Sequence, residues 1–203
     1  MIVVVDIGTG NLGSVVRALG RLSVKAKASS SASDIQRADK IILPGVGHFA
    51  RAANSLDRSG LRDALNEAVL THHKPILGIC LGMQLMARSS EEGDAIGLGW
   101  LDATVIKFEF KDRQKYKAPH MGWNTVASSG HGSILANVEI NDEFYFAHSY
   151  YLTVDDQTDV AGETEYETLF SSAVERDNIF GVQFHPEKSH AAGLKILKNF
   201  SDI

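Results

Sequence analysis

The chain contains little of several residue types that mark particular classes of protein. It has one cysteine in 203 residues, which excludes an internal disulfide framework and a cysteine-rich zinc site. Only four prolines and 22% charged residues accompany 44% hydrophobic residues, a composition that can bury a core and is not typical of a disordered segment. Positive charge is also scarce, because 20 basic residues face 25 acidic ones and the net charge is −5. This balance argues against a nucleic-acid-binding protein, which is normally basic.

Long hydrophobic runs are missing as well. No stretch reaches the roughly 18 uninterrupted apolar residues of a membrane helix. Residues 1–8 (MIVVVDIG) contain a short apolar run before Asp6 and lack the basic start of a secretory signal, so they are predicted to form a buried strand. We therefore expect a cytoplasmic protein in which the lone thiol stays reduced.

The first half of the chain alternates short apolar runs with amphipathic stretches. Apolar residues at helical spacing, or in short β-branched runs, distinguish the two kinds of element. Predicted strands cover 2–7, 40–43 and 75–79, and predicted helices cover 11–22, 56–70 and 81–88. This alternation predicts an α/β fold with a doubly wound, mostly parallel sheet that is flanked by helices.

The second half is richer in short strands joined by turns. A helix is predicted at about 191–200, after strands at 103–110, 124–127, 143–147, 150–154, 161–166, 172–176 and 179–183. We expect these strands to be antiparallel additions to the parallel sheet. No linker separates the halves, so the prediction is a single domain over residues 1–203.

The only cysteine lies in the segment Gly78-Ile-Cys80-Leu-Gly82, between a predicted strand and a predicted helix. Gly-x-Cys-x-Gly at such a junction is typical of a nucleophile elbow, a sharp turn at which flanking side chains would clash. Cys80 would lie at a helix N-terminus, whose partial positive charge favours a thiolate. A lone cysteine can also be a small buried core residue, so a second feature has to decide.

That second feature is His185-Pro-Glu187 near the C-terminus. A thiol nucleophile needs a base, and the base needs an acceptor that holds its ring and tautomer. His185 is the candidate base and Glu187 the candidate acceptor, because i, i+2 spacing in an extended segment places both side chains on one side of the chain. The sequence therefore predicts nucleophilic catalysis by Cys80, His185 and Glu187.

These segments together resemble the class I (triad) glutamine amidotransferases. The resemblance rests on GICLGMQ at 78–84, HPE at 185–187 and LPGVG at 43–47. Within the family, the chain is similar to the branch formed by the glutaminase subunits of imidazole glycerol phosphate synthases. The segments that carry this closer similarity are PGVGHF at 44–49, PHMGWN at 119–124, FAHSY at 146–150 and QFHPEKS at 183–189.

The resemblance implies a two-part reaction. Cys80 would attack the side-chain amide of glutamine, and hydrolysis of the resulting thioester with the help of His185 would give glutamate and ammonia. The partner would be a (βα)8-barrel cyclase subunit in a heterodimer. That subunit would use the ammonia to make imidazole glycerol phosphate and AICAR in histidine biosynthesis, and its substrate would activate the glutaminase.

The resemblance also assigns roles to individual residues. The oxyanion hole would consist of the backbone amides of Leu81 and Val46, with a peptide flip in the glycine-rich loop as the switch. Residues at or near the cyclase-facing surface and those that would hold glutamine follow by matching positions: Asn11, Trp123, Tyr145 and Lys188 for the surface, and Gly47, Gln84, Ser149 and Tyr150 for the substrate. Ordinary core packing is the competing interpretation of Trp123 and Tyr145.

Other signals carry less weight. Residues 8–13 (GTGNLG) follow a strand as in a dinucleotide-binding loop, but no carboxylate follows at the expected spacing before Asp34. We expect no cofactor, metal, membrane or nucleic acid. His120 and His148 receive no catalytic role and are expected to be structural or interface residues. Two alternatives remain: a paralogous amidotransferase that feeds another synthase, and a non-catalytic nucleotide-binding module.

Overall fold

Short runs of buried aliphatic residues form the centre of the structure, a computed structural model that describes residues 1–203. The strands are β1 (Ile2–Val5), β2 (Ala26–Ser29), β3 (Lys40–Gly45), β4 (Ile76–Cys80), β5 (Ser89–Ser90), β6 (Ala95–Ile96), β7 (Ala103–Lys107), β8 (His120–Thr125), β9 (Ala127–Ser128), β10 (Glu143–His148), β11 (Tyr150–Val154), β12 (Val160–Tyr166), β13 (Thr168–Arg176) and β14 (Ile179–Val182). The helices are α1 (Leu12–Arg21), α2 (Ala32–Arg37), α3 (Phe49–Ser59), α4 (Leu61–Asn66), α5 (Leu81–Gln84) and α6 (His190–Asp202), with single turns η1 (Glu67–Thr71), η2 (Gln157–Asp159) and η3 (Pro186–Lys188).

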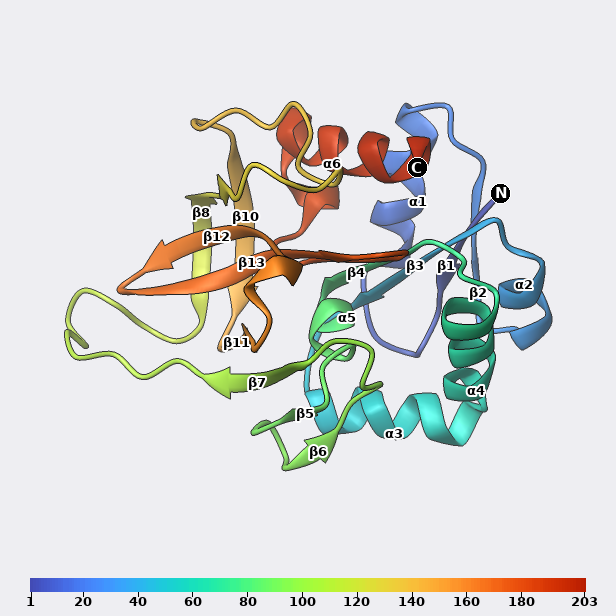
Figure 1. The fold of residues 1–203 in the computed structure, drawn as a ribbon, viewed down its shortest axis with the longest axis horizontal. Helices are drawn as coiled ribbons and strands as arrows, with labels where there is room; N and C mark the ends of the chain where they lie inside the picture. The colour runs from blue at the N-terminus through green and yellow to red at the C-terminus, as the bar shows by residue number, and fades with distance from the viewer.

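Twelve strands form one mixed sheet, and two form a small sheet of their own. Along the order β2-β1-β3-β4-β14 every pair is parallel, and β13, β11 and β7 then continue the sheet in antiparallel fashion. The antiparallel ribbon of β8 and β10 stands apart from this sheet, upright on the left in Figure 1. The predicted fold class is confirmed: a mostly parallel sheet carries antiparallel additions.

Successive side chains of the central strands point to opposite faces of the sheet and so divide the core into two layers. In β1, Val3 and Val5 pack with α3 and α4, whereas Ile2 and Val4 pack with α1 and α6. Figure 1 shows the two pairs of helices on opposite faces of the parallel strands. Because both faces are covered, β1 and β4 are buried at every position.

Several element boundaries differ from the prediction. The helix predicted at 56–70 is interrupted at Gly60, which adopts a left-handed conformation (φ 70°) between α3 and α4. The helix predicted at 81–88 ends at Gln84, and the strand predicted at 124–127 begins earlier, at His120. Strand β2 was not predicted, because its sequence AKAS contains no apolar run and none of its residues is fully buried. Helix α2, of six residues, was not predicted either.

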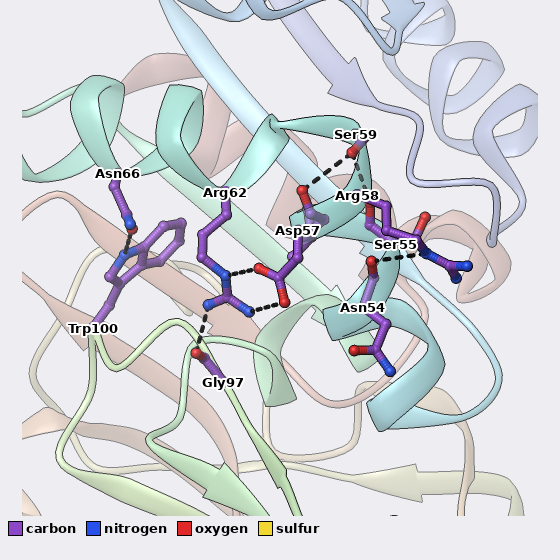
Figure 2. Close-up of polar contacts among 10 residues, drawn as sticks. Asn54, Ser55, Asp57, Arg58, Ser59, Arg62, Asn66, Gly97 and Trp100 are labelled. Carbon is purple, nitrogen blue, oxygen red and sulfur yellow. Dashed lines mark hydrogen bonds and ion pairs between the residues drawn. The ribbon is translucent and has the colours of Figure 1, made fainter.

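Polar contacts fasten the interrupted helix to the chain that precedes β7 (Figure 2). Arg62 on α4 pairs with Asp57 on α3 and donates to the carbonyl oxygen of Gly97 at 2.6 Å. The indole of Trp100 donates to Asn66 Oδ1 at 2.8 Å. These contacts hold the α3–α4 corner against the segment that follows α5.

Candidate active site

The turn from β4 into α5 has the geometry of a nucleophile elbow. Cys80 ends β4 with φ 55° and ψ −110°, a backbone conformation that costs a non-glycine residue free energy. A Cβ on Gly82 would lie 1.7 Å from the carbonyl oxygen of Leu43, and one on Gly78 would lie 2.7 Å from the Met83 backbone. Close packing therefore requires both glycines of the Gly-x-Cys-x-Gly segment.

His185 and Glu187 form a buried pair at the end of β14. Their Nδ1 and Oε1 atoms are 2.9 Å apart, and the two side chains are 2% and 3% exposed. The predicted reason for the pairing was wrong, because Pro186–Lys188 forms a turn of 3-10 helix and is not extended. The turn brings Glu187 back towards the ring, so the pair forms by a route other than strand alternation.

The structure places Cys80, His185 and Glu187 side by side, with His185 hydrogen-bonded to both of the others. Burial opposes a charge on His185, but hydrogen bonds and charge interactions with Cys80 and Glu187 outweigh it and raise the pKa of His185 to about 9. The imidazolium between these two residues is a proton donor beside the sulfur. This arrangement suits general acid catalysis followed by general base catalysis.

Cys80 opens into a cavity of about 230 Å³. The other predicted oxyanion and glutamine-binding residues line the same cavity: Val46, Gly47, Leu81, Gln84, Ser149 and Tyr150. Residues 45 and 80 are paired across β3 and β4, which places the glycine-rich loop beside the nucleophile. Gly47 has φ 105°, a conformation that favours glycine.

A further buried residue, Gln183, contacts the sulfur. Its Nε2 lies 3.6 Å from Cys80 Sγ, and its Oε1 accepts from Gln84 Nε2 at 2.9 Å. Gln84 also donates to the carbonyl oxygen of Tyr150 at 2.9 Å. The segment QFHPEKS at 183–189 predicted no role for Gln183, although a glutamine at the end of a predicted strand, two residues before His185, was an available signal.

Other cavity residues were also missed: Glu92, Pro119, Met121, Ala147 and His148. Glu92 carried no signal, because it lies in an irregular segment far from the motifs. Its carboxylate accepts the Phe49 backbone N–H at 2.7 Å and thereby fixes the start of α3 beside the cavity. Residues from segments that are far apart in the sequence therefore complete the lining of the cavity.

Two of the four predicted partner-facing residues, Trp123 and Tyr145, lie on the exposed side of the β8–β10 ribbon. Trp123 is 45% exposed, so it is not an ordinary core residue, and Tyr145 is half-buried. Their ring centroids are 5.8 Å apart, and Lys188 Nζ lies 5.4 Å from the Tyr145 ring. Asn11 caps α1, which contacts the turn that carries Lys188.

No helix has the length and apolarity needed to cross a membrane. No group of three or more histidine, cysteine, aspartate or glutamate side chains is arranged to hold a metal ion.

Comparison with known proteins identifies the family. The model of the class-I glutamine amidotransferase family matches residues 3–203. The chain belongs to this family. This class-I glutamine amidotransferase is 47% identical to the imidazole glycerol phosphate synthase subunit HisH 2 of Pseudomonas aeruginosa, and the match covers 100% of both chains. It is 42% identical to subunit HisH of Leptospira interrogans, again over 100% of both chains.

Solved structures share the fold of this amidotransferase. PurLQS from Thermotoga maritima gives a TM-score of 0.74 at 16% identity, covering 99% of this chain and 97% of that one. The glutaminase domain of CTPS from Trypanosoma brucei gives 0.64 at 16% identity, covering 99% and 93%. At such low identity these likenesses concern the fold alone.

Proposed function

We propose that this chain is the glutaminase subunit of an imidazole glycerol phosphate synthase in histidine biosynthesis, with residues 1–203 as a single amidotransferase domain. The observation that carries the proposal is the assembly of Cys80, His185 and Glu187 beside the cavity in a chain 47% identical to a HisH subunit over its full length. Glutamine is the substrate, and Gly47, Gln84 and the backbone of Ser149 and Tyr150 hold it.

In the first half-reaction, Cys80 Sγ attacks as a thiolate, its proton held by His185, and forms a bond to the side-chain amide carbon of glutamine. The carbonyl electrons move onto the oxygen, which the backbone amides of Leu81 and Val46 stabilise. His185 then donates its proton to the departing nitrogen, the carbon–nitrogen bond breaks, and ammonia leaves a glutamyl thioester on Cys80.

In the second half-reaction, neutral His185 takes a proton from water as the water oxygen attacks the thioester. The carbon–sulfur bond breaks, glutamate leaves and the sulfur of Cys80 is restored. Glu187 holds the Nδ1 side of the ring through both steps and stabilises the imidazolium. Gln183 donates to the sulfur and fixes its direction.

The ammonia passes to a (βα)8-barrel cyclase subunit, which consumes it while forming imidazole glycerol phosphate and AICAR. We place the cyclase on the surface made by Asn11, Trp123, Tyr145 and Lys188. Met121 adds to this surface and is 63% exposed. A large exposed apolar side chain next to an exposed tryptophan is typical of a protein–protein interface.

The test measures glutamate release by the purified chain alone, with the cyclase subunit, and with the cyclase and its nucleotide substrate. We expect strong release only in the complete mixture. Release that ignores the cyclase would reject the histidine pathway in favour of another synthase. Cys80→Ala and His185→Ala should each abolish glutamine-dependent synthesis and leave ammonia-dependent synthesis intact, and loss of both activities would contradict the catalytic roles.

A further inference from the structure

Two buried histidines lie directly opposite each other in the β8–β10 ribbon. His120 on β8 pairs with His148 on β10 in the register of the strands, and their exposed fractions are 3% and 6%. His148 also lines the cavity beside Cys80. The proposed reaction uses neither imidazole, so their burial at this place needs another explanation.

One arrangement of protons satisfies every contact of the pair. His148 Nδ1 is 2.8 Å from the carbonyl oxygen of Tyr150, which can only accept, so Nδ1 carries the proton. His148 Nε2 therefore accepts from His120 Nδ1, at 3.1 Å. His120 Nε2 is left as an acceptor, and the side-chain amide of Asn124 lies 3.4 Å from it. Each group in this series of hydrogen bonds donates to the next, from Asn124 through His120 and His148 to Tyr150.

The surroundings keep both rings neutral. Burial lowers the pKa of His120 to about 4 and the pKa of His148 to about 3. The ring of His120 stacks on Tyr166 with centroids 3.9 Å apart and on Phe146 at 4.8 Å. Two charged imidazoles could not make the contact between them, because each nitrogen would be a donor. The tautomers are thus set by the packing.

This series of hydrogen bonds ends at a backbone group of the proposed glutamine site, the carbonyl oxygen of Tyr150. The carbonyl oxygen of Tyr150 accepts from His148 and from Gln84 Nε2, which lies 2.9 Å away. These two donors come from different elements, β10 and α5. We infer that His148 is a positioning residue, which fixes the Tyr150 peptide in the orientation that glutamine binding needs, and that the Tyr150 carbonyl oxygen keeps the proton of His148 on Nδ1. This inference rests on the proposed glutaminase function.

The test uses a chloroketone analogue of L-glutamine, which first binds reversibly and then alkylates a cysteine. Saturation kinetics on the purified chain separate the affinity constant KI from the maximal rate of alkylation. Loss of one hydrogen bond that positions a binding group should raise KI about tenfold in His148→Phe, with a smaller change in the maximal rate. His148→Asn should restore KI to within about threefold, because its amide can donate to Tyr150 from the same position.

His120→Phe is the matched control. It removes a buried histidine from the same cluster but leaves the His148–Tyr150 contact, so KI should change much less than in His148→Phe. Equal rises in KI in both phenylalanine variants, or an unchanged KI in His148→Phe, would overturn the inference. A wild-type chain that shows no saturable labelling would instead contradict the proposed glutamine site, so the two failures are distinguishable.

Discussion

Single side chains around Cys80 have separate and identifiable tasks. Gln183 contacts the sulfur, and His185 lies between the sulfur and Glu187. Glu187 Oε2 is buried without a hydrogen-bond partner, so the Nδ1 contact through Oε1 is the main compensation for burying this carboxylate. The contacts of His185 with Cys80 and Glu187 together therefore favour the charged imidazolium over the neutral ring.

Replacement of Glu187 by glutamine should lower the pKa of His185 from about 9, because the ring loses a buried carboxylate. In the wild type the folded-state pKa exceeds the value of about 6.5 in an unfolded chain. The protonated ring thus contributes stability that is complete below about pH 6.5 and is lost as the pH rises through about 9.

The free energy of unfolding by denaturant, measured from pH 6 to pH 10, checks this expectation. The difference between wild type and Glu187→Gln should be largest at the acidic end and shrink towards the alkaline end. The exposed Glu109→Gln serves as a control without such a trend. A difference that stays constant with pH would contradict a charged His185.

Among the elements, β3, β4 and α5 depend most on one another. The N-terminus of α5 packs so closely on β3 that Gly82 faces the carbonyl oxygen of Leu43. This approach brings the glycine-rich loop to the sulfur and gives Cys80 its unusual backbone conformation. The elbow is thus a three-element structure, held by contacts that allow no side chain at residue 82.

Gly82→Ala should destabilise the protein by roughly 3 kcal/mol or more, because a Cβ 1.7 Å from a carbonyl oxygen forces β3 and α5 apart. Gly20→Ala, in α1, is the matched control. No atom lies within 4 Å of a Cβ at that position. This control should be more stable than wild type by about 0.5 kcal/mol, since alanine favours a helix. Chemical denaturation of both variants tests this, and equal stabilities would disprove the packing argument.

At the scale of the whole molecule, the burial of neutral histidines makes the free energy of unfolding depend on pH in the acidic range. His120 and His148 stay neutral in the folded protein down to about pH 4 and 3, whereas the unfolded chain protonates them near pH 6.5. The unfolded state binds more protons in that range, so the stability that these two histidines contribute is complete above about pH 6.5 and falls as the pH decreases.

We expect each of these two histidines to contribute up to about 1.4 kcal/mol per pH unit to this fall. His148→Phe should therefore flatten the dependence of unfolding free energy on pH between about 6.5 and 5, relative to wild type, by about one histidine's share. Urea unfolding at several pH values in that window measures the slopes. Parallel slopes would show that His148 is protonated in the folded protein.

Much of this molecule follows from short-range pattern. The spacing of Gly78, Cys80 and Gly82 predicted the elbow, and apolar runs predicted β1, β3 and β4, because turn glycines and apolar runs are local features of the sequence. The same reasoning missed β2, an edge strand without an apolar run, and joined α3 to α4 across Gly60. Patterns of apolar residues do not report a strand whose side chains are only partly covered.

The rest depends on which segments the fold places side by side. Gln183 meets Cys80 because β14 pairs with β4, although 103 residues separate them in sequence. His120 and His148 meet through the register of the β8–β10 ribbon. Even the His185–Glu187 pair, expected from spacing, forms through a turn of 3-10 helix. Local sequence specifies backbone preference within a few residues, whereas the cavity and its hydrogen bonds arise from contacts between distant segments, which exist only once the strands are ordered.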